Sequence, residues 1–259
     1  PKKLGNIDII TAGFPCQAFS VAGYRKGFND PRGNLFFEIA RFIDSIKPRV
    51  YFLENVKNLK GHDKGETLRI IEKTLTKDLG YSFYYFILNT KDYDVPQTRE
   101  RIYIVGFRDK TNASNFKEPE PIQSTKTIHD ILLKERQPDK YYYKENHQYY
   151  KALTREVKSE DTLYQWRRVY VRENKNGLCP TLTANMGTGG HNVPLIKNSH
   201  GIRKLTPREC LRFQGFPDDF EIPEKMAVSH LYKQIGNSVT VPVVEKIAEN
   251  IKIALEKNK

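Results

Sequence analysis

A cysteine near the start of the chain, Cys16, is of a type and in a position to act as a nucleophile. It follows the apolar run 7–10, which predicts a buried strand, and Gly13 and Pro15 then break that strand and place the thiol on an exposed turn. The carboxyl end of a parallel strand is where α/β folds bind their ligands. A single unpaired cysteine is more often a small packing residue, so its role depends on the residues that follow.

Carboxyl, amide and guanidinium groups flank two further predicted strands. The apolar run 50–53 leads directly into Glu54 and Asn55, and Arg99 and Arg101 precede the apolar run 102–105. Taken singly, Glu54 is typical of a salt bridge, Asn55 of a turn, and the arginines of surface charges. Together with a thiol they could form a site for covalent chemistry with acid assistance.

Strands and helices alternate around these residues. Apolar residues recur with helical spacing over 34–46, with Asn34 as the cap, and again over 68–79, with Gly80 as the stop. Further strands are predicted over 81–88 and 102–105, and a helix over 244–255. This alternation predicts an α/β sheet with helices on both faces. Near the end, Thr206, Pro207 and Glu209 predict a capped helix start.

The regular pattern fades between about 109 and 204, where prolines, tyrosines and charges accumulate. This shift predicts a separate, smaller domain rich in loops and strands. Alternation over 168–172 predicts a half-exposed strand with arginines on one face, suited to phosphate contacts or base stacking, although such strands more often simply pack. The glycine cluster 187–190 lacks the helix and acidic residue of a dinucleotide-binding loop, so we interpret it as a flexible loop.

Composition narrows the class of protein. A net charge of +12, from 43 Lys+Arg against 31 Asp+Glu in 259 residues, favours a polyanionic partner such as nucleic acid, with a solvated basic surface as the alternative. Three widely separated cysteines form neither a disulfide framework nor a zinc site, which favours a reducing compartment. No signal peptide or membrane-spanning run is evident, so we expect a soluble protein without a metal.

Several short motifs stand in a fixed order along the chain. They are Pro15-Cys16-Gln17, Glu54-Asn55-Val56, Gln97-x-Arg99-x-Arg101, Leu205-Thr206-x-Arg208-Glu209, Gln214-Gly215-Phe216-Pro217 and Gln234-x-Gly236-Asn237-Ser238-Val239. This ordered set resembles the C5-type DNA cytosine methyltransferase family, particularly the enzymes of bacterial restriction-modification systems. The resemblance spans nearly the whole chain and is weakest over 111–178.

The resemblance implies a fold and a division into domains. We expect the class I S-adenosylmethionine-dependent methyltransferase fold, with a mixed, mostly parallel sheet that is incomplete at its amino terminus. Residues 1–125 would form the partial catalytic domain, 126–233 a target-recognition domain with its hinge, and 234–259 a segment returning to the catalytic domain.

The resemblance also implies a mechanism. C5 of cytosine accepts a methyl group only after a nucleophile adds at C6, a role suited to the thiolate of Cys16. Glu54 would assist at N3 and would need a pKa raised by desolvation. Asn55 would orient the base edge or the carboxyl group, Arg101 would hold the cytosine O2, and Arg99 the neighbouring phosphate or loop.

The family's other contacts map onto further positions. Because the target carbon is unreachable inside a duplex, the base must be flipped out, with 17–33 as the closing lid. Cofactor contacts are expected at Gly13, Phe14, Pro15, Asn237, Ser238 and Val239. Double-stranded DNA is expected to contact Gln17, Ser20, Arg25, Arg32, Arg167, Arg168, Arg172, Thr181, Thr183, Gly187, Gly189 and Gly190.

The sequence departs from the family at its start. The family opens with a strand, a glycine-rich turn and an acidic residue that together hold S-adenosylmethionine, and these are absent from the residues before Cys16. We expect a truncated sequence or a separate amino-terminal subunit, and weak cofactor binding by this polypeptide alone. The remaining expectations are a monomer on DNA and a bacterial cytoplasmic, nucleoid-associated location. A transfer-RNA methyltransferase and a non-catalytic DNA-binding relative are the alternative functions.

Overall fold

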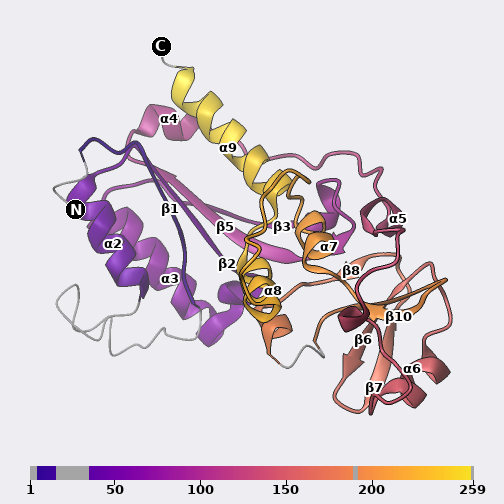
Figure 1. The fold of residues 1–259 in the computed structure, drawn as a ribbon. Helices are drawn as coiled ribbons and strands as arrows, with labels where there is room; N and C mark the ends of the chain where they lie inside the picture. Colours follow the sequence, from indigo (N-terminus) through magenta and orange to yellow (C-terminus); the bar gives the residue numbers. More distant parts are fainter. Residues whose placement is uncertain (1–4, 16–34, 189–191, 258–259) are drawn as a thin grey trace. The chain divides into compact units, whose positions relative to one another are not determined.

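The computed structural model describes residues 5–15, 35–188 and 192–257. The chain divides into two compact units (Figure 1). Unit 1 comprises residues 1–88, 100–119 and 247–259, and unit 2 comprises 89–99 and 120–246. The α/β class expected from the sequence is confirmed. The sequence-based boundaries at 125 and 233 stay predictions.

Unit 1 is built on a four-stranded mixed sheet in the order β1-β2-β5-β3. The strands are β1 (Ile9–Gly13), β2 (Val50–Val56), β3 (Tyr84–Asn89) and β5 (Glu100–Phe107). β1 runs parallel to β2, with Gly13 opposite Glu54, and β2 runs antiparallel to β5. The parallel register brings the end of β1, where the motif of Cys16 begins, to the edge of the sheet that carries Glu54.

The central strands β2 and β5 bury side chains on both faces, because each is apolar over most of its length. On one face, Tyr51 and Leu53 pack with residues of α2 (Leu35–Ile46) and α3 (Glu66–Lys73). On the other, Phe52, Tyr103 and Phe116 take part in a chain of aromatic contacts. α4 (Lys110–Asn115) and the part of α9 (Val241–Glu256) from Ile247 onward also belong to unit 1, and Asn250 of α9 donates to the carbonyl of Lys117.

Unit 2 contains a second four-stranded sheet in the order β10-β9-β6-β7 and a short parallel pair, β4 with β8. Its strands are β4 (Gln97–Thr98), β6 (Leu163–Arg167), β7 (Tyr170–Asn174), β8 (Cys179–Pro180), β9 (Leu195–Asn198) and β10 (Gly201–Lys204). Its helices are α5 (Ile128–Ile131), α6 (Tyr150–Glu156), α7 (Pro207–Arg212) and α8 (Val228–Asn237). Leu163 and Ile196 pack in a core that includes residues of α7 and α8, whereas Tyr164 and Trp166 pack on the opposite face with α6.

Several predicted elements are confirmed and others are not. Thr206 caps α7, with Pro207 in the first turn and Glu209 completing a capping box. The strand expected over 168–172 begins two residues later, at Tyr170 of β7, because Arg168, with φ of 55°, and Val169 form the turn of the β6–β7 hairpin. α8 has no counterpart in the sequence analysis. No helix in the described ranges is long and apolar enough to cross a membrane.

Candidate active site and DNA-contact surface

Two motif residues form an ion pair at the edge of the unit 1 sheet. Glu54 ends the buried part of β2, and Arg101 lies near the start of β5, which runs antiparallel beside it. The guanidinium Nε of Arg101 lies 3.0 Å from Oε1 of Glu54, with side chains 14% and 23% exposed. Such a half-buried pair holds both groups in fixed orientation while leaving the carboxylate reachable from solvent.

Asn55 fixes the backbone that leads toward the segment of Cys16. Its side chain is buried, its Nδ2 donates to the carbonyl oxygen of Phe14 at 2.7 Å, and its Oδ1 accepts from the amide of Val56 at 2.8 Å. Phe14 is itself buried and packs against Phe36 of α2. Asn55 therefore ties the strand carrying Glu54 to the end of β1.

Arg99 is buried within unit 2 and donates to backbone carbonyls. Its Nη1 donates to the carbonyl of Leu182 at 2.6 Å, and its Nη2 donates to those of Ser238 at 2.7 Å and Gly236 at 3.3 Å. With 2% exposure, the side chain has little surface for a phosphate. The geometry favours the loop-holding alternative for Arg99.

The motif around Gly236 requires a residue without a side chain. A Cβ at Gly236 would lie 2.1 Å from the backbone carbon of Thr183, and one at Gly187 would lie 2.4 Å from the carbonyl oxygen of Ser229. α8 therefore packs directly on the segment 183–187. Asn237 is the last residue of α8 and Ser238 its cap, so the predicted cofactor residues 237–239 begin where this helix ends.

A buried polar network, missed by the sequence analysis, joins the same motifs. Gln97 donates to the carbonyl of Phe213 and to Oε1 of Gln214, and it accepts from the amide of Leu182. Gln214 in turn donates to the carbonyl of Ile235 at 2.9 Å. These fully buried amides hold together segments that are far apart in sequence, which explains glutamines at positions 97 and 214.

The predicted DNA-contact residues of unit 2 have different surroundings. Arg167 and Arg172 line a polar cleft together with Thr181 and Thr183. Thr181 also donates to the carbonyl of Thr98 at 2.6 Å. Arg168 lies exposed in the hairpin turn. Cys16, Gln17, Ser20, Arg25, Arg32, Gly189 and Gly190 lie outside the described residues.

The other two cysteines are enclosed. Cys179 and Cys210 are fully buried, and burial raises the pKa of both thiols well above the ordinary value of 9.0. A protonated, inaccessible thiol is a poor nucleophile. Among the described residues, no group of three His, Cys, Asp or Glu could hold a metal ion.

Comparison with known proteins identifies the family. The profile of the C-5 cytosine-specific DNA methylase family matches residues 1–253. The chain belongs to this family. It is 57% identical to the type II methyltransferase M.Bsp6I of Bacillus sp. (strain RFL6), over 95% of this chain and 79% of that protein. It is 42% identical to the type II methyltransferase M.HpaII of Haemophilus parainfluenzae, over 94% of this chain and 71% of that protein.

The fold agrees with this membership. The structure of the S. pombe Dnmt2 methyltransferase superposes with a TM-score of 0.68 at 20% identity, covering 96% of this chain and 79% of that one. The chain is thus a cytosine-5 DNA methyltransferase of the restriction-modification type, in a family whose methyl donor is S-adenosylmethionine.

The described residues supply only part of a site for that donor. A groove of about 460 Å³ lies beside Gly13 in unit 1, lined by β1, α2 and Ile7. Thr11 and Glu38 are its only polar side chains among the described residues, so it offers apolar contact but few partners for the charged ends of the cofactor. The described residues of this groove therefore do not fit the cofactor.

Proposed function

We propose that this chain acts on cytosine through covalent addition, with Cys16 as the nucleophile. The observation that carries the proposal is the pairing of Glu54 with Arg101 at the sheet edge where β1 ends. In the proposed step, the sulfur of Cys16 bonds to C6 of the flipped base, the C5–C6 double bond shifts its electrons toward N3, and Glu54 delivers a proton there. Arg101 binds the cytosine O2 and fixes the position of the Glu54 carboxyl group.

The second half of the reaction restores the ring. The methyl donor of the family, S-adenosylmethionine, would supply the methyl group to C5. A base then takes the C5 proton, and the electrons of the C5–H bond form the C5–C6 double bond. The sulfur of Cys16 leaves C6 with the electrons of the sulfur–C6 bond, and N3 returns its proton to Glu54. Asn55 acts as a positioning residue, because its amide holds the carbonyl of Phe14 at the end of the strand that leads to Cys16.

A hydrogen-exchange experiment tests the addition step without the methyl donor. Reversible addition at C6 makes the C5 hydrogen exchange with solvent, so duplex DNA tritiated at C5 of cytosine should lose tritium when mixed with the chain. Loss that vanishes in Cys16→Ser supports the nucleophile. Retention of tritium despite intact DNA binding would favour the non-catalytic DNA-binding alternative. Loss from transfer RNA but not from DNA would favour the RNA-modifying one.

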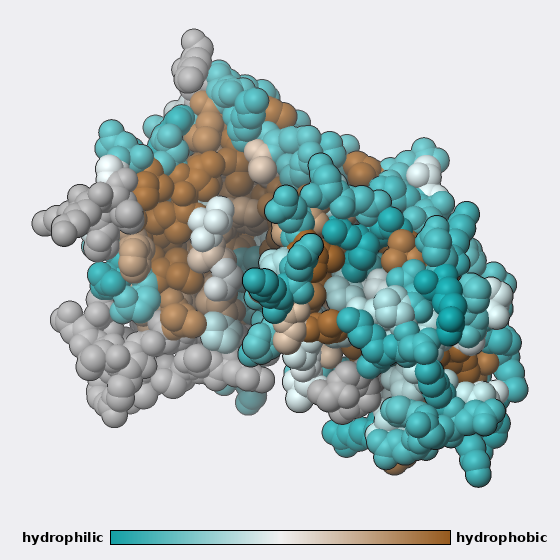
Figure 2. All heavy atoms as spheres, in the orientation of Figure 1, coloured by the Kyte–Doolittle hydropathy of each residue, from teal (hydrophilic) through white to brown (hydrophobic). Residues whose placement is uncertain are grey.

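We further propose that the free edge of β1 receives a strand from an additional polypeptide segment, either on the same chain or on a separate subunit. Among the described strands β1 pairs only with β2, and Ile9 is 41% exposed. Figure 2 shows hydrophobic side chains gathered on the face of unit 1 in the region of β1. An exposed apolar strand edge normally requires a cover.

The exposed apolar residues of α2 also favour an added polypeptide segment at this surface. Leu35, Ile39, Phe42 and Ile46 recur at helical spacing and line the groove beside β1, and Leu35 is 53% exposed. A strand added to β1, followed by a chain crossing α2, would cover both. The part of M.Bsp6I that this chain does not match is a suitable test segment. Mixing it with the chain should raise the affinity for S-adenosylmethionine in calorimetry, and unchanged affinity would count against this occupant.

A further inference from the structure

A polar cleft in unit 2 has a composition suited to reading nucleic-acid bases. It encloses about 420 Å³ beside the β6–β7 hairpin. Its lining carries two arginines and no carboxylate, and the remaining polar groups are amides and threonine hydroxyls. The amide and guanidinium side chains on which the inference depends are Gln165, Arg167, Arg172, Asn174, Asn176 and Asn185.

The hairpin presents four of these side chains on one face. Gln165 stands directly opposite Arg172, and Asn174 opposite Leu163, so these residues and Arg167 share a side of the antiparallel pair. The intervening residues Tyr164 and Trp166 pack into the apolar cluster on the other side. Strand alternation therefore gives the hairpin one face that packs in the apolar cluster and another face, toward the cleft, that is rich in hydrogen-bonding groups.

Asn174, which lines this cleft, has a buried amide donor without an acceptor among the described residues. The residue is 7% exposed, and its Nδ2 has no hydrogen-bond partner in the described part of the chain. Its backbone carbonyl is occupied by the hydroxyl of Thr162 at 2.6 Å, which fixes the strand and not the side chain. A buried amide without a partner is unfavourable, so a ligand acceptor in the cleft would relieve it.

The neighbouring side chains are partly organised. Nη2 of Arg167 donates to Oε1 of Gln165 at 3.2 Å, which orients the glutamine amide. Arg172 stands opposite Gln165 and is exposed, and its guanidinium group makes no hydrogen bond or ion pair with any described residue. Arg167 thus positions the amide of Gln165, while the guanidinium group of Arg172 remains accessible to a ligand.

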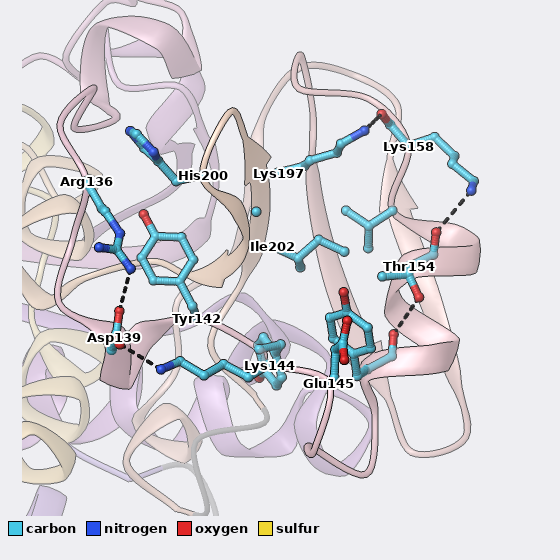
Figure 3. Close-up of a pocket in the computed structure, with 14 residues that line it drawn as sticks. Arg136, Asp139, Tyr142, Lys144, Glu145, Thr154, Lys158, Lys197, His200 and Ile202 are labelled. Atoms are coloured by element: carbon cyan, nitrogen blue, oxygen red, sulfur yellow. Dashed lines mark hydrogen bonds and ion pairs between the residues drawn. The ribbon is translucent and has the colours of Figure 1, made fainter.

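A second hollow on the opposite face of this sheet shows the contrast (Figure 3). There Oδ1 of Asp139 lies 2.8 Å from Nη2 of Arg136 and Oδ2 lies 2.6 Å from Nζ of Lys144, so both cations have an anionic partner. Lys197 and Lys158 donate to backbone carbonyls at 3.0 Å. Its polar groups are largely satisfied internally, unlike Asn174 and Arg172 in the cleft.

We propose that the cleft reads a purine in the target duplex, with Gln165, Arg172 and Asn174 as specificity-determining residues. This inference rests on the proposed function. Arginine donates two bonds to O6 and N7 of guanine, and an amide both donates to N7 and accepts from N6 of adenine. Phosphate oxygens only accept hydrogen bonds, so a phosphate would offer no donor to the amide oxygens of the cleft. The mixed donors and acceptors match a base edge.

The test compares sequence preference in matched variants. The native chain, Gln165→Ala, Arg172→Ala and Asn174→Ser are each mixed with duplexes randomised around one cytosine, and the bound duplexes are sequenced. Glu173→Gln, on the other face of β7, is the control. The fluorescence of Trp166 verifies that each variant folds. If Asn174→Ser does not fold, Asn174→Asp takes its place.

The expected result is a loss of preference at one or two base pairs by about 10- to 100-fold, the discrimination that one bidentate pair provides, with Glu173→Gln unchanged. Unchanged preference in all three variants would overturn the inference. So would a uniform loss of affinity for every sequence with a weaker salt dependence, because that marks a phosphate contact. Tritium release measured in parallel separates the two proposals. If the native chain releases no tritium, the covalent mechanism is wrong. If a variant releases tritium from cytosines in any sequence, the result supports a role of the cleft in sequence recognition.

Discussion

The amide of Asn55 donates to the carbonyl of Phe14 across 2.7 Å, joining the strand of Glu54 to the end of β1. Asn55→Ala removes this bond and leaves a buried carbonyl without its donor, so we expect unit 1 to lose about 1–3 kcal/mol of stability. Thermal unfolding followed by circular dichroism measures the loss. Asn250→Ala, which removes an exposed amide-to-carbonyl bond to Lys117, is the matched control and should cost clearly less.

The exchange assay gives Asn55 a second readout. If the bond serves to place the segment that follows Phe14, tritium release should fall in Asn55→Ala at a temperature where the variant is fully folded. Release equal to that of the native chain would restrict Asn55 to a stabilising role.

Replacement of Glu54 tests the proton donor. In Glu54→Gln the side chain keeps its shape but loses the transferable proton, so we expect tritium release to slow by about 10²–10⁴-fold with DNA affinity retained. Glu100→Gln provides the control, because it removes the carboxylate of the exposed pair with Lys57, where Nζ and Oε1 lie 2.9 Å apart. A Glu54→Gln variant that exchanges at the native rate would rule out this carboxyl group as the acid.

Gly236 should tolerate no side chain. The added Cβ in Gly236→Ala would lie 2.1 Å from backbone of Thr183, which has no flexible end to move aside. We expect about 1–3 kcal/mol of destabilisation of unit 2 from overpacking. The single tryptophan, Trp166, lies in unit 2, so urea unfolding followed by its fluorescence reports this unit.

The control for Gly236 is Gly61→Ala, where no atom lies within 4 Å of the added Cβ. It should leave the tryptophan transition unchanged. An equally stable Gly236→Ala protein would show that α8 and the segment 183–187 can separate without cost.

The elements set by local spacing were predictable from the sequence, and the interactions that bring distant segments together were not. Periodicity located α2, and cap chemistry located the start of α7. The apolar spacing over 34–46 includes Leu35 and Phe42, which the structure leaves exposed, because only neighbouring elements decide which apolar side chains are covered. Nothing in the local sequence indicates that Arg99 donates to the carbonyl of Ser238.

The β6–β7 hairpin shows how a small error in an element changes the site. Assigning 168–172 to one strand placed Arg168 and Arg172 on a common face, whereas the turn at Arg168 separates them. Cross-strand pairing around a two-residue turn at 168–169 groups Gln165 and Arg167 with Arg172 and Asn174, whereas simple alternation from Leu163 does not. The missing signal was the turn itself, since Arg168 adopts a positive φ that its residue type does not indicate.

The two buried thiols give a pH dependence with a definite sign. Because burial raises the pKa of Cys179 and Cys210 above 9.0, the folded state keeps protons that the unfolded chain releases in alkali. Stability from this source is complete below pH 9.0 and declines as the pH rises above it. Urea midpoints at neutral pH and about pH 10 should differ in that direction.

Alkylation provides the direct measurement. In Cys16→Ser, the remaining thiols should resist iodoacetamide at mildly alkaline pH until urea is added, as followed by mass spectrometry. Rapid labelling of either thiol in the folded protein would show that its site opens to solvent.

The buried ion pair of Arg203 and Glu209 should be the most sensitive charge pair of unit 2. Both side chains are 0% exposed, with Nη2 and Oε1 2.6 Å apart, and Glu209 also accepts from the amides of Thr206 and Leu133. Glu209→Gln leaves the arginine charge buried without a carboxylate, so we expect about 3–5 kcal/mol of destabilisation.

Asp218→Asn breaks the neighbouring but more exposed pair with Arg212, and it should cost less than about 1 kcal/mol. Trp166 fluorescence in urea compares the two variants, and equal losses would mean that burial does not set the strength of the Arg203–Glu209 pair.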